Sequence, residues 1–133
     1  MKRKSSKRSS ERRDVARLQD IPNVGTAIAG DLRLLGITLP AELPGRDPYA
    51  MYDDLCRITG QRHDPCLLDT FIAAVRFMEG EPKKPWWKYT AERKRELFLI
   101  GAYARRAGVQ RGFVIAAAAA GGLTGIALII ALR

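Results

Sequence analysis

The sequence predicts an all-α fold, and three observations lead to this expectation. No segment shows sustained alternation of apolar and polar residues, the pattern typical of a half-buried strand. Apolar residues instead recur at helical spacing, as at Ile28, Leu32 and Leu35. Two further helices are indicated by Asp-Pro pairs at Asp47 and Asp64, because aspartate caps a helix well and proline suits its first position.

The chain divides into zones that differ in hydropathy. Residues 1–13 contain no apolar residue after Met1, so we expect a disordered basic tail. Residues 14–90 hold the apolar positions of one modest core and are predicted to form the folded domain. Residues 91–112 are predicted as a basic amphipathic helix or linker, and residues 113–132 as a hydrophobic helix.

The charge is also uneven along the chain. The net charge of +9 favours an acidic partner such as nucleic acid or an anionic membrane surface. Residues 1–13 and residues 81–112 each carry a net charge of +6, whereas residues 14–80 carry −4. We therefore expect any long-range attraction to come from the flanks rather than from the folded middle.

The helices follow from caps and breakers. A short helix is expected over residues 11–19, with a small apolar face of Val15, Ala16 and Leu18. It should end before Pro22, because the residue before a proline is pushed out of the α region. Further helices are predicted over residues 26–35, 48–59 and 65–79, each followed by a glycine. The last of these should be the central core helix, since it carries a broad apolar stripe. The stripe consists of Leu67, Leu68, Phe71, Ile72, Val75 and Met78.

The segment from Ile21 to Gly25 resembles the helix-hairpin-helix motif, in which a Gly-x-Gly hairpin is usual. A tight hairpin exposes backbone N–H groups at the start of the following helix, where the dipole favours an anion such as a DNA phosphate. Asn23 replaces the first glycine, and Asn tolerates left-handed conformations. The predicted phosphate-binding residues are Asn23, Val24, Gly25, Thr26 and Ala27. The alternative is a hairpin used only for packing or protein contact.

Five separated motifs together resemble one bacterial family. They are residues 18–25, residues 31–37, Arg46-Asp47-Pro48-Tyr49, Arg62-His63-Asp64-Pro65-Cys66 and Pro85-Trp86-Trp87-Lys88-Tyr89-Thr90. In this order, over about residues 14–95, they are similar to the small helix-hairpin-helix family labelled pathogenicity-locus or mitomycin-resistance proteins. The resemblance implies a helix-hairpin-helix fold and association with DNA, and it implies no reaction.

Cys56, His63 and Cys66 form a Cys-x6-His-x2-Cys pattern. Thiolate and imidazole are good zinc ligands, but a closed site needs a fourth, and the nearby Asp64 is already needed as a helix cap. Both cysteines fall on the apolar stripes of their helices. We therefore predict two buried structural thiols, with His63 at the surface and no metal or other cofactor. A zinc site or a transient disulfide is the alternative.

Trp86 and Trp87 precede two further residues suited to nucleic acids, Lys88 and Tyr89. The pair has two interpretations. Exposed tryptophans can stack on unpaired bases, but two tryptophans in a loop more often close the edge of a small core. The second interpretation is the one we favour.

Residues 113–132 carry no charge and would form a helix about 30 Å long, enough to cross the hydrocarbon core of a membrane. Three arginines within residues 105–111 precede this run, and only Arg133 follows it. The sequence therefore predicts a transmembrane helix that anchors a cytoplasmic domain to the inner membrane. Glycines within residues 121–125 would allow homo-oligomer contacts. The alternative is a helix packed on the domain or on another chain.

No catalytic constellation is visible. The chain has no Ser-His-Asp set, Walker loop or HExxH motif, and its only histidine is His63. Asp53 and Asp54 resemble the acid of helix-hairpin-helix glycosylases, but the domain is too small for a base-flipping pocket. We predict a non-enzymatic module, tethered to a membrane, that binds DNA backbone without sequence specificity. The alternative is a protein-interaction adaptor at the cytoplasmic membrane face.

Overall fold

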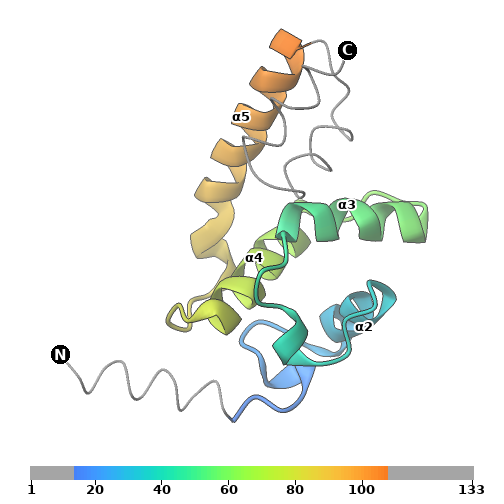
Figure 1. Cartoon of the computed structure of the whole chain (residues 1–133), viewed down its shortest axis with the longest axis vertical. Coiled ribbons are helices and arrows are strands. Elements are labelled where there is room, and N and C mark those ends of the chain that lie inside the picture. The colour runs from blue at the N-terminus through green and yellow to red at the C-terminus, as the bar shows by residue number, and fades with distance from the viewer. Residues whose placement is uncertain (1–13, 108–133) are drawn as a thin grey trace, which may run out of the picture. The chain divides into compact units, whose positions relative to one another are not determined.

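A computed structural model describes residues 14–107, and every regular element in this range is helical (Figure 1). The predicted all-α class is therefore confirmed for this range. The elements, with η denoting a 3-10 helix, are η1 (Leu18–Asp20), α2 (Thr26–Leu34), η2 (Pro40–Glu42), α3 (Pro48–Thr59), α4 (Pro65–Glu79), η3 (Trp86–Tyr89) and α5 (Thr90–Ala107). The chain divides between Thr90 and Ala91 into two compact units.

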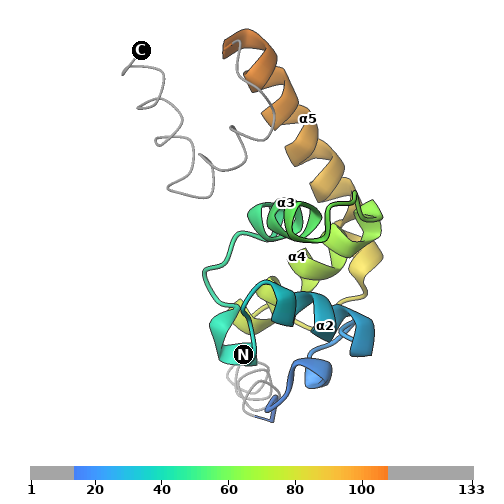
Figure 2. The ribbon, with the colours of Figure 1, turned by 90° about the vertical axis from the view of Figure 1, so that its right-hand side faces the viewer.

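Helix α4 forms the centre of the first unit, as its apolar stripe predicted. Phe71, Ile72 and Val75 are almost completely buried, and ten of its residues are buried in all. One side of α4 belongs to the larger core with α2 and α3, which lie one above the other in both ribbon views (Figures 1 and 2). Because burial of apolar area is the main stabilising term in folding, the apolar surface of α4 contributes most to holding the other elements in place.

A second, smaller core cluster lies on another side of α4 and holds η3. Its buried members are Leu68, Ile72, Ala73 and Tyr89. Partly buried aromatic side chains, including Trp86, pack against this cluster. The Thr90 hydroxyl donates a hydrogen bond of 2.7 Å to the buried Asp69 carboxylate, which further fastens the end of η3 to α4.

The two Asp-Pro pairs begin helices as predicted. The Asp47 carboxylate accepts hydrogen bonds from the backbone N–H groups of Tyr49 at 2.8 Å and Ala50 at 3.4 Å. The Asp64 carboxylate accepts from the backbone N–H of Cys66 at 2.7 Å. Each cap satisfies donors that would otherwise lack an intrahelical partner, and such a cap stabilises a helix by about 1 kcal/mol.

The helix expected over residues 11–19 is wrong where the structure describes it. Helical geometry begins only at Leu18 and lasts for the single turn η1. The Asp20 carboxylate reaches back to the backbone N–H of Arg17 at 2.8 Å and pairs with its guanidinium at 3.1 Å, which closes one tight turn. The segment has too few apolar positions to support the costly nucleation of an α-helix.

The membrane-spanning part of the predicted fold must also be corrected. Within residues 14–107, none of the helices is long and apolar enough to cross a membrane. The longest, α5, has 18 residues but carries seven charged side chains. The predicted span over residues 113–132 itself lies outside the described residues, and so does the basic tail over residues 1–13.

Candidate functional site

The hairpin between η1 and α2 is closed by two backbone hydrogen bonds and one left-handed residue. The N–H of Ile21 donates to the carbonyl of Leu18, and the N–H of Val24 donates to that of Ile21, each at 3.1 Å. Between them Asn23 takes a φ of 69°, the one positive φ of a non-glycine residue within the described range. The structure thus confirms that asparagine supplies the left-handed conformation that glycine usually supplies.

The five predicted site residues do not all lie at the surface. Four of them are exposed: Asn23, Gly25, Thr26 and Ala27. The side chain of Val24 is buried in the larger core. Val24 therefore anchors the hairpin, and only its backbone can belong to a binding surface. The neighbouring Ile21 and Leu18 are buried in the same cluster, so the turn is held to the core along its length.

The N-terminus of α2 differs from those of α3 and α4. Gly25 occupies its N-cap position with a φ of −91° and no side-chain cap hydrogen bond. A Cβ added at Gly25 would meet nothing within 4 Å, so the space beside this N-cap residue is open. The first backbone N–H groups of a helix carry the positive end of its dipole. The arrangement leaves these donors accessible to an acceptor from outside the chain.

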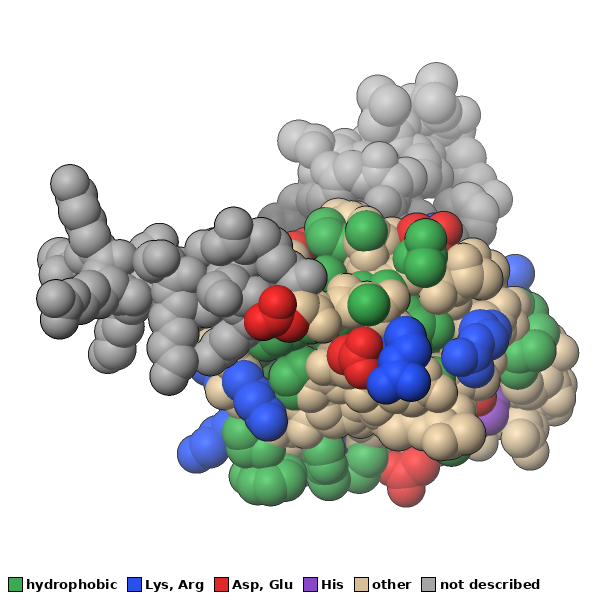
Figure 3. Space-filling model, turned by 90° about the horizontal axis from the view of Figure 1, so that it is seen from below, with side chains coloured by type: hydrophobic (Ala, Val, Ile, Leu, Met, Phe, Trp, Pro, Cys, Tyr) green, Lys and Arg blue, Asp and Glu red, His purple; other side chains and the backbone are tan. Residues whose placement is uncertain are grey.

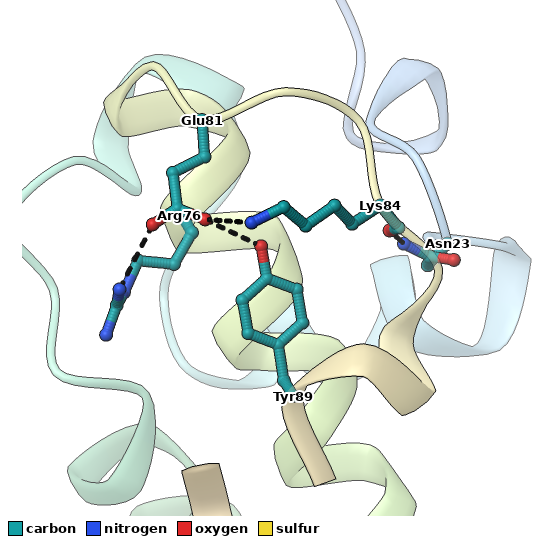
Figure 4. Close-up of polar contacts among 5 residues, drawn as sticks. All are labelled: Asn23, Arg76, Glu81, Lys84 and Tyr89. Atoms are coloured by element: carbon teal, nitrogen blue, oxygen red, sulfur yellow. Dashed lines mark hydrogen bonds and ion pairs between the residues drawn. The ribbon is translucent and has the colours of Figure 1, made fainter. Parts of the chain in front are cut away.

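A contact between distant segments, which the sequence did not predict, lies beside the hairpin (Figure 4). The Nδ2 of Asn23 donates a hydrogen bond of 2.8 Å to the backbone carbonyl of Lys84, 61 residues further along the chain. This bond holds the loop between α4 and η3 against the hairpin. Lys83 and Lys84, both exposed, are therefore neighbours of the hairpin rather than part of a separate flank.

The same loop is fixed by the carboxylate of Glu81 (Figure 4). It accepts hydrogen bonds from the Tyr89 hydroxyl at 2.9 Å, from Arg76 Nη1 at 3.1 Å and from Lys84 Nζ at 3.3 Å. Burial alone would raise the pKa of Glu81, but the bonds from Tyr89, Arg76 and Lys84 outweigh it, so the pKa lies below its usual value. The ionised carboxylate thus joins the end of α4 to η3.

The two tryptophans differ in burial although their rings are in contact. Trp86 packs against the smaller core cluster, as the favoured interpretation predicted, whereas the side chain of Trp87 is 57% exposed. Their rings meet edge to face, with centroids 5.7 Å apart and planes at 88°. The interpretation as core closure therefore holds for Trp86 and fails for Trp87.

The structure does not group Cys56, His63 and Cys66 as the ligands of a metal ion. Cys56 is half-buried and Cys66 is exposed, so the prediction of two buried thiols is wrong for Cys66, which lies in the first turn of α4. The half-buried His63 is held by α3: its Nε2 lies 2.8 Å from Thr59 Oγ1, and its carbonyl accepts from the Tyr52 hydroxyl. Among residues 14–107, no group of three or more His, Cys, Asp or Glu residues could hold a metal ion.

The fold and hairpin define a small helical module with an uncapped helix N-terminus at its surface. Residues 11–95 match the model of a family described as Cdd1, pathogenicity locus, and the chain belongs to this family. The chain is also similar to the mitomycin resistance protein McrB of Streptomyces lavendulae. The two are 46% identical over 99 residues, which cover 74% of this chain and 92% of the relative. No solved structure matches the chain.

Proposed function

We propose that this chain is a non-enzymatic module that binds the DNA backbone without sequence specificity. The observation that carries the proposal is the start of α2 at Gly25, uncapped and open, in a domain whose α3 and α4 are capped by Asp47 and Asp64. A phosphate oxygen is a suitable acceptor for backbone N–H groups at a helix N-terminus. Such a contact positions a protein on DNA but reads no base.

Basic side chains next to the hairpin support a polyanion as the ligand. The bond from Asn23 to the Lys84 carbonyl keeps Lys83 and Lys84 beside the start of α2. The ammonium of Lys84 is already paired with Glu81 and lies over the ring of Tyr89, so Lys83 is the better candidate to neutralise a phosphate. Lysines that neutralise phosphates release counterions, and this release supplies most of the affinity in binding that is independent of sequence.

The negative charge of residues 14–80 is explained by the architecture. Eight of the ten carboxylates in this range have an internal partner, as helix caps, turn closures or ion pairs. They are Asp20, Glu42, Asp47, Asp53, Asp54, Asp64, Asp69 and Glu79. On the face drawn in Figure 3, acidic and basic side chains are interspersed and no acidic patch forms. On this face, the negative charge of the range therefore does not gather into a surface that repels DNA.

The substitution Gly25→Asp tests the phosphate contact with two readouts of opposite sign. The φ of Gly25 suits any residue, and nothing obstructs a new side chain. The aspartate should cap α2 and stabilise the fold by a few tenths of a kcal/mol. It should also occupy the N–H groups and weaken binding of the full chain to a short duplex by about tenfold, since hydrogen bonds to charged groups are strong.

The matched control is Gly30→Asp, which adds the same charge to the same helix away from its N-terminus. Gly30 also has open space for a side chain. Fluorescence anisotropy should show a much smaller loss of duplex affinity for Gly30→Asp than for Gly25→Asp. Equal losses in both variants would mean that the start of α2 holds no phosphate.

A second candidate function is a protein-interaction adaptor, favoured by two exposed leucines. Leu34 is 54% exposed and Leu39 is 56% exposed, on either side of the turn at Gly36. Exposed apolar side chains that form one patch are typical of a contact surface, and these two lie close in sequence. In that case Leu39→Ala would weaken partner binding, and Gly25→Asp would leave it unchanged.

The name of the McrB relative adds a cellular role to the proposal. We extend resistance to mitomycin from that protein to this chain, on the strength of the 46% identity. If the role depends on the contact at α2, cells carrying Gly25→Asp should be as sensitive to mitomycin as cells without the protein. Cells carrying Gly30→Asp should keep their resistance.

A further inference from the structure

Trp87 is an exposed aromatic side chain on a rigid support. Its ring rests edge to face against Trp86, which is itself packed on the cluster of Leu68, Ile72 and Tyr89. Tryptophan has only two side-chain torsions, so an already fixed ring loses little conformational entropy when a ligand stacks on it. This arrangement is favourable for binding a flat partner.

The turn that carries Trp87 is fastened at both ends. At its start, the Lys84 carbonyl accepts the bond from Asn23, and Lys88 N–H donates to the carbonyl of Pro85 at 3.1 Å. At its end, the Tyr89 hydroxyl donates to Glu81. The backbone around Trp87 is therefore determined by contacts to both the hairpin and α4.

Trp87 also lies within reach of the start of α2. Two residues separate it from Lys84, whose carbonyl accepts the hydrogen bond from Asn23 of the hairpin, and the three chain steps from Lys84 to Trp87 extend over at most about 11 Å. Successive bases of a DNA strand rise by about 3.4 Å. A nucleotide a few steps along the strand from a phosphate held at α2 can thus reach the ring of Trp87.

We infer that Trp87 stacks on an unpaired base of DNA whose phosphate is bound at the start of α2. The inference rests on the proposed function and names its preferred substrate: DNA with a single-stranded gap. Bases inside an intact duplex are already stacked and are not available to the ring. Every base has a π-face, so this contact selects DNA structure without selecting sequence.

The surroundings of Trp87 favour a nucleotide over an apolar protein partner. Lys88 follows it directly, and Lys83 and Lys84 precede it in the same loop, all with exposed side chains. Lysine is depleted at the centres of protein–protein interfaces, where anchoring aromatics lie. Aromatic rings interleaved with positive charge are instead typical of surfaces that bind single strands.

The test compares two DNA probes in binding to the full chain. One is a short duplex closed at both ends by ethylene glycol linkers, so that it has no unpaired base. The other is the same duplex with a short single-stranded gap. We expect the gapped probe to bind at least about fivefold more tightly, because stacking on a base adds affinity of this order. Binding should also quench tryptophan fluorescence.

Three variants make the comparison specific to the ring. Trp87→Ala should bring the two affinities together while leaving binding to the closed duplex within about twofold. Trp87→Phe should keep part of the preference, since a smaller aromatic ring still stacks. Leu39→Ala is the matched control, because Leu39 is 56% exposed and lies at the start of another element, η2; it should keep the full preference.

The outcomes separate this inference from the proposed function. A preference for the gap that disappears in Trp87→Ala supports the inference. Equal binding of both probes by the unmodified chain, or a preference that persists in Trp87→Ala, overturns it. In those two cases a loss of duplex binding in Gly25→Asp would still support the proposed function. If the chain binds neither probe, both proposals fall.

Discussion

At the scale of single residues, Asn23 has two structural roles, and glycine could fill only one of them. Its backbone takes the left-handed conformation that the hairpin needs, and its side-chain amide holds the loop at Lys84. A glycine would meet the first requirement more easily, because it has no Cβ to strain in that region. The asparagine therefore makes the hairpin part of a larger surface.

Substitutions at Asn23 should distinguish the role of its backbone conformation from the role of its side-chain amide. Asn23→Gly keeps the backbone conformation and loses the bond to Lys84, so the free energy of unfolding should fall by about 1 kcal/mol or less. Asn23→Asp removes the donor and brings a carboxylate toward the Lys84 carbonyl, so the fall should be larger. Urea unfolding followed by circular dichroism measures both. If Asn23→Gly were the less stable variant, the carboxylate of Asn23→Asp would not repel the Lys84 carbonyl as expected.

The depressed pKa of Glu81 predicts how stability depends on pH. Because the folded pKa lies below the ordinary value of 4.5, the ionised carboxylate stabilises the fold at pH values above 4.5. This contribution is lost as the pH falls through the lower folded pKa. Relative to Glu81→Gln, the unmodified chain should therefore be more stable at neutral pH and lose that advantage in acid.

Unfolding in urea over a series of pH values from neutral to acid measures this difference. Asp31→Asn serves as the control, because it removes the same charge from another element, α2. The difference between the unmodified chain and Glu81→Gln should shrink in acid. A difference that stays constant with pH would show that Glu81 contributes through packing rather than through its charge.

At the scale of elements, the sequence predicts the long helices and misses the short ones. The Asp-Pro pairs and the apolar stripe define α3 and α4 because a cap and a helical period are local signals. The turns η1, η2 and η3 span only three or four residues, too few for a period to appear. The first two are closed instead by the side chains of Asp20 and Glu42, which reach back to backbone N–H groups.

The candidate site was predictable only in part, for the same reason. The hairpin and its left-handed Asn23 follow from neighbouring residues, so the sequence could indicate them. The bond from Asn23 to Lys84 joins residues 61 positions apart, and no local pattern encodes it. The separate environments of Trp86 and Trp87 likewise depend on where α4 packs, which spacing alone does not give.

The caps of α3 and α4 should have effects opposite to that of a cap added to α2. Asp47→Ala and Asp64→Ala should each lower the free energy of unfolding by about 1 kcal/mol, because helix N–H groups lose their acceptor. Asp47→Asn and Asp64→Asn should cost much less, since asparagine caps nearly as well. Urea unfolding checks the series. Equal losses in the Ala and Asn variants would indicate that charge, not hydrogen bonding, matters at these positions.

At the scale of the whole molecule, structure and charge are divided between segments. The carboxylates of residues 14–80 are largely used to cap helices and close turns, so the net charge of −4 is a consequence of how the domain folds. The opposite charge is carried by residues 1–13 and 81–112, each at +6. Three lysines of the second segment lie in the loop and turn that the domain itself fixes. Long-range attraction and local contact can thus be varied independently.

The salt dependence of DNA binding should reveal this division. Each phosphate neutralised by Lys or Arg contributes about −0.9 to the slope of log affinity against log salt. Replacing the seven Lys and Arg residues of residues 1–13 by Gln keeps the length of the chain and removes their charge. If the tail neutralises phosphates, the slope should become flatter, by up to about six. Gly25→Asp in the unmodified chain should instead lower affinity at every salt concentration and change the slope by about one. A slope that is unaffected by the tail substitutions would mean that the attraction comes from residues 81–112, and the lysines beside the hairpin would then be the next to replace.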